Sequence, residues 1–125
     1  MMRVLICGDR DWTDEAPMRR LVAHLGAGDV VIEGEARGAD KMARRLAEEA
    51  GVPVVPCPAE WDRYGRAAGP IRNRRMLTEC RPDIVVAFHD DLFNSKGTRN
   101  MMDVAGRAGI PVWLFADGRC TTYHD

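Results

Sequence analysis

The chain has 125 residues, of which 46% are hydrophobic and 30% charged, and its formal net charge is −1. This length and composition are typical of one soluble globular domain that buries a core without disulfides or metal, and they argue against a disordered or membrane-spanning chain. The near-neutral charge disfavours non-specific nucleic-acid binding, which usually needs a strongly basic surface. We therefore expect a single domain over residues 1–125, located in the cytoplasm.

Short apolar runs and helical patterns alternate along the first half of the chain. The apolar runs predict strands over residues 3–7, 29–33 and 53–56, and the prolines of the third place it at a sheet edge. Helices are predicted over residues 13–25, capped by Thr13, and over residues 39–50. In the second helix, Arg44 with Glu48 and Arg45 with Glu49 are spaced to pair on the outer face.

The second half of the chain continues this alternation. A loop over residues 57–69 leads to a helix that begins at Gly69 and Pro70 and runs to about Cys80. The remaining predicted elements are a strand over residues 84–88, a helix over 97–108 and a strand over 111–116. Residues 116–125 are predicted to form a frayed tail.

Five apolar strands alternating with four helices predict an α/β fold, in which helices cover both faces of a central parallel sheet. Ligands of such folds bind beyond the carboxyl ends of the strands. The loops that meet at this edge cover residues 8–13, 34–40, 57–69 and 89–97, and they are rich in glycine and polar residues. We predict that one cleft there is surrounded by Gly8, Gly34, Gly38, Arg72 and Gly97.

Three arginines crowd the start of the helix that follows Gly69 and Pro70. Arg72, Arg74 and Arg75 fall within its first two turns, where the helix dipole makes each cation unfavourable by roughly 0.3–1 kcal/mol unless an anion is bound. We interpret this segment as a phosphate-binding element with Arg72 as the main anchor, and we expect Arg72→Ala to leave the fold intact. A solvated basic surface is the alternative interpretation.

Two more loops have the composition of phosphate-binding turns. The glycines of Gly34-x-x-x-Gly38-Ala39-Asp40 can let the backbone approach an anion, or they can serve only close helix packing. The hydroxyls of Ser95-Lys96-Gly97-Thr98 can cap a helix or donate to a phosphate. The spacing of a Walker loop is absent, so we do not predict ATP hydrolysis.

Aromatic and metal-binding side chains leave several interpretations open. Trp12, Trp61 and Tyr64 can stack on a base or ribose, or anchor their loops. The His89-Asp90-Asp91 turn is predicted to be solvated, and Cys7 and Cys80 are predicted to be small buried hydrophobes. No two of the four cysteines have the spacing of a metal knuckle, so we expect neither a metal nor another cofactor.

Taken together, the motifs resemble those of the YspA-like (YpsA-related) family of the SLOG (Smf/DprA–Lonely Guy) superfamily. The matching segments are Gly8 to Trp12, Gly34 to Asp40, Trp61 to Asn73 and Ser95 to Thr98, within about Arg3 to Phe115. The resemblance implies a Rossmann-like three-layer fold and binding of a nucleotide or a nucleotide-derived ligand. The superfamily includes Lonely Guy phosphoribohydrolases, which cleave nucleoside monophosphates at the N-glycosidic bond, and DprA proteins, which bind single-stranded DNA.

The catalytic motifs of the Lonely Guy enzymes match only in part. Arg72 and Met76 have the spacing of their Arg-x-x-x-Met, and Gly97 with Thr98 matches the Gly-Thr of their phosphate loop. Ser95 replaces a glycine of that loop, and Met101 stands where those enzymes carry a catalytic Glu. Because Met cannot move a proton, catalysis would need another group. The catalytic residue is left unassigned, with Arg72, Asp9, Glu35, Asp40 and Asp103 as candidates.

Three functions follow from these observations. The first is binding of a phosphorylated nucleotide or an ADP-ribose-like ligand as a sensor or accessory domain, the second is an N-glycosidase acting on nucleoside monophosphates, and the third is DprA-like single-strand binding. We also expect a homodimer, formed through an exposed apolar patch of Phe93, Met101 and Met102. The residues expected to contact the ligand are Gly8, Asp9, Arg10, Gly34, Arg37, Gly38, Asp40, Arg72, Asn73, Arg75, Ser95, Gly97 and Thr98.

Overall fold

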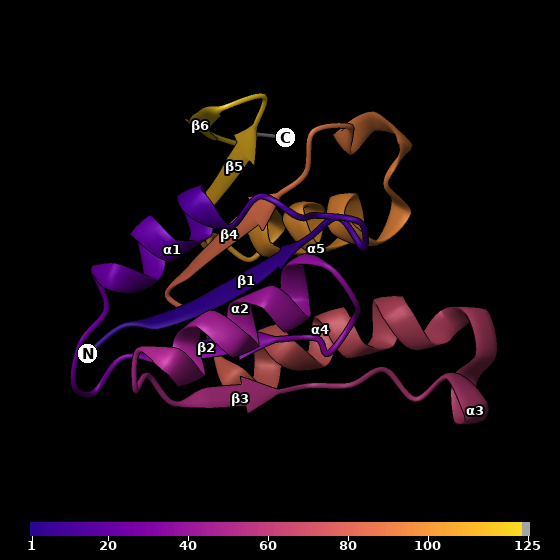
Figure 1. The fold of residues 1–125 in the computed structure, drawn as a ribbon. Helices are drawn as coiled ribbons and strands as arrows, with labels where there is room; N and C mark the ends of the chain where they lie inside the picture. The colour runs from indigo at the N-terminus through magenta and orange to yellow at the C-terminus, as the bar shows by residue number, and fades with distance from the viewer. Residues whose placement is uncertain (124–125) are drawn as a thin grey trace.

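A six-stranded sheet lies between two layers of helices in the computed structural model, which describes residues 1–123 (Figure 1). The strands are β1 (Arg3–Gly8), β2 (Val30–Glu33), β3 (Val54–Pro56), β4 (Ile84–Phe88), β5 (Val112–Ala116) and β6 (Arg119–Thr122). The helices are α1 (Glu15–Ala23), α2 (Ala39–Glu49), α3 (Trp61–Tyr64), α4 (Ala68–Cys80) and α5 (Lys96–Arg107), with short 3-10 turns η1 (Gly65–Ala67) and η2 (Leu92–Asn94). The strand order is β3-β2-β1-β4-β5-β6.

The predicted α/β class is confirmed, because β1 to β5 run parallel and helices pack on both faces. Alternate residues of β1 show why its apolar run is continuous. Val4 and Ile6 belong to the core that α1 and α2 cover, whereas Leu5 and Cys7 belong to the core that α4 and α5 cover. A strand buried on both faces needs apolar residues at every position.

The prediction of a frayed tail is wrong for residues 116–122. β6 pairs antiparallel with β5 and makes the sheet six strands wide, one more than expected. Asp117 (φ 50°) and Gly118 (φ 75°) form the two-residue connection between them. An Asp-Gly pair with positive φ at both positions is a favoured hairpin turn, because its twist matches that of the strands. Residues 124–125 of the predicted tail lie outside the described residues.

Helical structure around the arginine-rich segment begins earlier than predicted. α3 and η1 occupy the predicted loop, and α4 begins at Ala68, which makes Pro70 its third residue and Arg72 its fifth. Arg72 therefore lies in the second turn, where the dipole argument for a bound anion is weaker. The cap of α1 also differs from the prediction, because the side chain of Asp14, one residue after Thr13, accepts from the Ala16 N–H.

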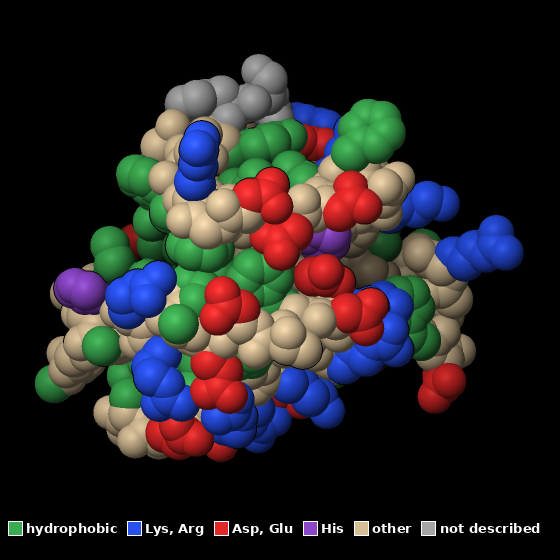
Figure 2. Space-filling view, turned by 45° about the horizontal axis from the view of Figure 1, so that its top comes forward, with side chains coloured by type: hydrophobic (Ala, Val, Ile, Leu, Met, Phe, Trp, Pro, Cys, Tyr) green, Lys and Arg blue, Asp and Glu red, His purple; other side chains and the backbone are tan. Residues whose placement is uncertain are grey.

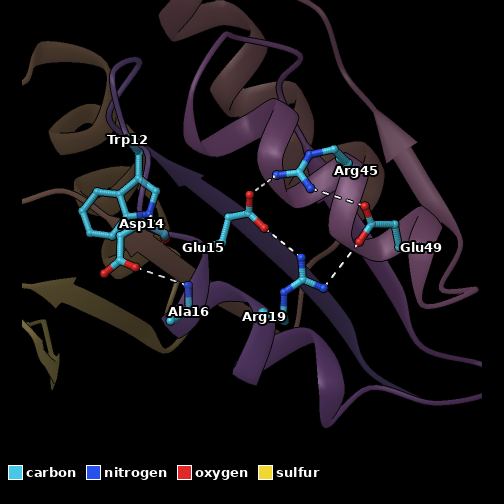
Figure 3. A network of polar contacts seen from close by, with 7 residues as sticks. All are labelled: Trp12, Asp14, Glu15, Ala16, Arg19, Arg45 and Glu49. Atoms are coloured by element: carbon cyan, nitrogen blue, oxygen red, sulfur yellow. Dashed lines mark hydrogen bonds and ion pairs between the residues drawn. The ribbon is translucent and has the colours of Figure 1, made fainter.

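A closed ring of ion pairs links α1 to α2. Glu15 pairs with Arg19 and Arg45, and Glu49 pairs with the same two arginines (Figure 3). The predicted pair of Arg45 with Glu49 is thus one side of a larger network, and the predicted pair of Arg44 with Glu48 also forms. All four side chains of the ring are substantially exposed, so the ring orients the two helices more than it stabilises them.

One region of the sheet has an apolar surface. Between α1 and the β5–β6 hairpin, a groove is lined by Leu21, Ile84, Val86, Trp113 and Phe115, and hydrophobic side chains fill this space in Figure 2. The predicted patch on α5 is wrong, because Met101 and Met102 are buried in the core, and only Phe93 is exposed. The homodimer therefore stays a prediction without that patch. Among residues 1–123, none of the helices is both long and apolar enough to cross a membrane.

Candidate functional site

A cleft of about 390 Å³ opens at the carboxyl ends of β1 and β4, the neighbouring strands at which the strand order changes direction. Four segments surround it: the loop after β1, the start of α2, the second turn of α4, and the loop that leads into α5. The predicted site residues that line it are Gly8, Asp9, Arg10, Arg37, Asp40, Arg72, Asn73, Ser95, Gly97 and Thr98.

A second compartment adjoins this cleft on the α3 side. It is lined by Gly34, Glu35 and Trp61, and it shares Arg10, Ala36, Arg37 and Arg72 with the main cleft. The Arg10 guanidinium lies 5.9 Å from the centre of the Trp61 ring, and about half of the tryptophan surface is exposed. The two compartments together give a polar chamber with an aromatic side chain at one end.

Arg72 connects three segments of the site. Its Nη1 donates to the carbonyl oxygens of Gly34 at 2.6 Å and Cys57 at 3.5 Å, and its Nε donates to Asn73 Oδ1 at 2.9 Å. Its Nη2 group has no hydrogen bond to any of residues 1–123, so two N–H donors remain for a ligand. The absence of a side chain at Gly34 makes room for this guanidinium, because a Cβ there would lie 2.5 Å from Nη1.

Asn73 continues this connection to α5. Its amide nitrogen donates to Asn100 Oδ1 at 3.0 Å and to the Gly97 carbonyl at 3.3 Å. The Asn73 amide therefore holds α5 beside α4, in addition to its predicted contact with the ligand.

Asp40 is a buried acid beside Arg72. Its residue surface is only 6% exposed, and this burial raises the pKa of the carboxyl to about 6, although Arg72 and the Ala36 N–H, 3.2 Å away, act in the opposite direction. The positive charge of Arg72 thus favours the ionised form of this buried acid. The expectation that Arg72→Ala leaves the fold intact stays a prediction, and the structure argues against it, because the change removes that charge and three hydrogen bonds.

The loop that enters α2 is closed by its own contacts. The Ala39 N–H donates to the Asp9 carbonyl at 3.0 Å, and the Lys41 N–H donates to the Ala36 carbonyl at 3.2 Å. A Cβ on Gly38 would lie 2.3 Å from the Asp9 carbonyl oxygen, and Gly38 does not line the cleft. Gly38 is therefore explained by close packing against the loop after β1, where the alternative interpretation of this motif was close helix packing.

The loop that enters α5 is open by comparison. Ser95 Oγ accepts from the Thr98 N–H at 3.1 Å and caps the helix. A Cβ built on Gly97 meets no atom within 4 Å. Lys96 is exposed and forms no ion pair with any described residue. The N–H groups of Lys96 and Gly97 are at the start of the helix, so no carbonyl of the helix can accept from them. Both residues line the cleft.

Two glutamates near Asp40 are engaged away from the main cleft. Glu35, a catalytic candidate, forms an ion pair with Arg44 on α2. Glu33 is completely buried at the end of β2, where Oε1 accepts from the Glu35 N–H and Oε2 has no partner among the described residues. Burial and the nearby Glu35 raise the pKa of Glu33.

Several predicted ligand contacts lie elsewhere in the structure. Trp12 is buried in the core against Phe88 and Phe115, so its prediction as a stacking residue is wrong. Arg75 forms exposed ion pairs with Glu60 and Glu79 and does not line the main cleft. Neither does Tyr64, whose ring lies against Arg63, nor Asp103, which accepts from the Tyr123 hydroxyl.

His89 is a cleft residue that sequence reasoning missed. It is 9% exposed, so the prediction of a solvated turn is wrong for this residue, and its Nδ1 accepts from the Asp91 N–H at 3.0 Å. The neutral ring that makes this bond carries its proton on Nε2. Its position directly after β4 is the sequence feature that could have identified it as a cleft residue. Asp11, Asn94 and Lys96 also line the cleft, and Met101 contributes an apolar side chain to it.

Comparisons with known proteins agree with the motifs. A family model described as the YspA, cpYpsA-related SLOG family matches residues 2–64. The Gene 61 protein of Mycobacterium phage D29 is 40% identical over 126 residues, covering 94% of this chain and 98% of the relative. The structure of UDP-GlcNAc 2-epimerase from Neisseria meningitidis bound to UDP-GlcNAc has a TM-score of 0.53 and 13% identity. That match covers 92% of this chain but only 32% of the epimerase, and it shows a shared fold alone.

Proposed function

The chain belongs to the YspA, cpYpsA-related SLOG family, and we propose that its cleft binds the phosphate of a nucleotide or a nucleotide-derived, ADP-ribose-like ligand. The observation that carries this proposal is that residues with unused donors line the same cleft. These donors are Nη2 of Arg72, the ammonium of Lys96 and the first N–H groups of α5. Guanidinium, ammonium and helix N-terminal N–H groups are complementary to a phosphate.

The rest of the ligand would extend from this position into the second compartment. Arg10 and Trp61 there present a cation and an aromatic face, a pairing that suits a base or a second phosphate. The mixed charge of the cleft, with Asp9 and Asp40 among the basic residues, favours a ligand that carries hydroxyl groups as well as phosphate. A nucleotide has both.

Isothermal titration with AMP, ADP-ribose and adenosine tests the proposal. We expect the phosphorylated ligands to bind and adenosine to bind far more weakly. Lys96→Ala should weaken phosphate-dependent binding without changing the melting temperature, because Lys96 is exposed and unpaired among the described residues. Arg72→Lys should lose roughly 2 kcal/mol of binding or more, because ammonium cannot form the same fork.

Arg75→Ala is the matched control for both variants. Arg75 lies on the same helix as Arg72 and carries the same charge as Arg72 and Lys96, and among residues 1–123 its ion pairs are with exposed glutamates alone. Its replacement should leave affinity unchanged. Equal losses in Lys96→Ala and Arg75→Ala, or equal binding of AMP and adenosine, would contradict a specific phosphate site.

Asp40 favours a second candidate function, N-glycosidic cleavage of nucleoside monophosphates. Its buried carboxyl lines the cleft and has a pKa of about 6, which suits a group that exchanges a proton near neutral pH. Met101 weighs against the Lonely Guy mechanism, because an apolar side chain occupies the place of the catalytic Glu. Free base released from AMP by the wild-type protein and lost in Asp40→Asn would support cleavage. Binding of AMP without release would leave the first function.

A further inference from the structure

Two cysteines outside the main cleft lie side by side. Cys57 follows β3, Cys80 is the last residue of α4, and their Sγ atoms are 3.5 Å apart. Since a disulfide bond is about 2.05 Å long, the sulfurs need to approach by only about 1.5 Å. Both cysteines are half-buried and line a cavity of about 420 Å³ that also contains Pro58 and Arg75.

Backbone contacts hold both cysteines against the sheet. The Cys57 N–H donates to the Glu33 carbonyl at 2.8 Å, and the Cys80 carbonyl accepts from Arg3 Nε at 2.6 Å. The fold therefore fixes the backbone on both sides of the pair, and we expect closure to occur mainly by rotation of the two side chains. The other two cysteines are placed differently, with Cys7 buried at the end of β1 and Cys120 exposed on β6.

We propose that Cys57 and Cys80 form a redox site that closes to an intramolecular disulfide by exchange with a small disulfide such as glutathione disulfide. One protein thiolate attacks glutathione disulfide and releases one glutathione. The second protein sulfur then attacks the mixed disulfide and releases the other. The protein gains one S–S bond and loses two thiol protons, which the two released glutathione thiolates take up. Two protein thiols are oxidised, and one glutathione disulfide is reduced.

The surroundings of Cys57 favour its thiol form. Burial, together with the hydrogen bond to Cys80 and the nearby Glu33, raises the pKa of Cys57 to about 12, although Arg72 acts in the opposite direction, so its thiolate is scarce at neutral pH. Because the thiolate is the reacting species, closure should accelerate as the pH rises from 7 to 9. The cavity beside the two sulfurs gives the small disulfide its access.

The closed site would hold the segment after β3 against the end of α4. The two cysteines are 23 residues apart, so the bond closes a loop that contains α3, η1 and all of α4. Cross-linking a loop of this length restricts the unfolded chain, and the oxidised protein should melt roughly 5–12 °C higher than the reduced protein.

The experiment incubates the full chain with glutathione disulfide at pH 8, followed by intact mass and a thiol count under denaturing conditions. We expect two of the four thiols to disappear, with a mass loss of about 2 Da and no disulfide-linked dimer. Cys57→Ser and Cys80→Ser should each abolish the 2 Da loss. Cys7→Ser and Cys120→Ser are the matched controls and should retain it.

Three results would overturn the proposal. The first is a wild-type protein that keeps all four thiols, and the second is a Cys57→Ser variant that still loses 2 Da. The third comes from thermal melts of wild-type protein alone, so it does not depend on whether a variant folds. An oxidised protein that melts no higher than the reduced protein would show that the bond does not join the two segments as the structure places them.

Discussion

The loops that enter α2 and α5 look alike in the sequence, and the structure separates them. Each follows a strand, contains glycine and a polar residue near a helix start, and reaches the same edge of the sheet. At α2, the carboxylate of Asp40 and the carbonyl of Asp9 already accept from the N–H groups of Ala36 and Ala39, and Gly38 has no free space. At α5, Gly97 faces open space and only the Thr98 N–H is capped by Ser95. A glycine therefore marks a close approach of backbone in one loop and an accessible helix start in the other.

We expect Gly38→Ala to cause the largest loss of stability. The residue has a φ of +77°, and an added Cβ would lie 2.3 Å from the Asp9 carbonyl oxygen. Both the strain and the overlap with backbone act against the folded state, so we expect a loss of about 3 kcal/mol or more, or failure to fold. Urea unfolding measures it. A variant as stable as the wild-type protein would show that the α2 loop has the freedom that we assign to the α5 loop.

We expect Asp40→Asn to have an intermediate effect, which is a change in how the stability of the fold depends on pH. The folded-state pKa of about 6 lies above the ordinary value of 3.8, so the folded protein binds more protons between these values. Wild-type stability should therefore fall as the pH rises from about 4 to about 6, by about 1–3 kcal/mol, and Asp40→Asn should lack this part of the slope. Urea unfolding of both proteins at pH 4, 5, 6 and 7 tests this. Parallel pH profiles would mean that Asp40 is not the buried acid of the α2 loop.

The smallest effect on the fold is expected from Gly97→Ala, which is the counterpart of Gly38→Ala. No atom obstructs the new methyl group, and alanine is the better helix former, so stability should be unchanged or up to about 1 kcal/mol higher. The methyl would stand at the open helix start, and AMP affinity should fall roughly tenfold, or about 1.4 kcal/mol. Titration calorimetry beside a thermal melt gives both values. Unchanged affinity would place the phosphate away from α5.

Sequence patterns predicted the parts of the fold that depend on neighbours along the chain. The continuous apolar runs gave β1 and β4 close to their observed bounds, and the prolines correctly placed β3 at an edge of the sheet. The β5–β6 hairpin was missed although Asp117-Gly118 is a strong turn signal, because the polar residues of β6 do not alternate with apolar ones.

The location of the site could be predicted from the sequence, but most of its contacts could not. The loops at the carboxyl ends of the strands do surround the cleft, but the partner of Arg72 at Gly34 lies 38 residues away in the sequence. The burial of Trp12 was also missed. A tryptophan in a polar loop is expected to be exposed, and only the fold places Phe88 and Phe115 beside it. The pairing of Cys57 with Cys80 also requires the folded backbone.

The central position of β1 has a consequence for how the chain is made. β1 is synthesised before both of its partners, because it pairs on one side with β2 and on the other with β4, which begins at Ile84. Contacts over such sequence separations form late and slow the folding of a domain. Until the ribosome has released β4, the nascent chain carries an unpaired apolar strand edge, the kind of surface that holdase chaperones protect. The cleft therefore comes into existence only after β4 and the start of α5 have been synthesised.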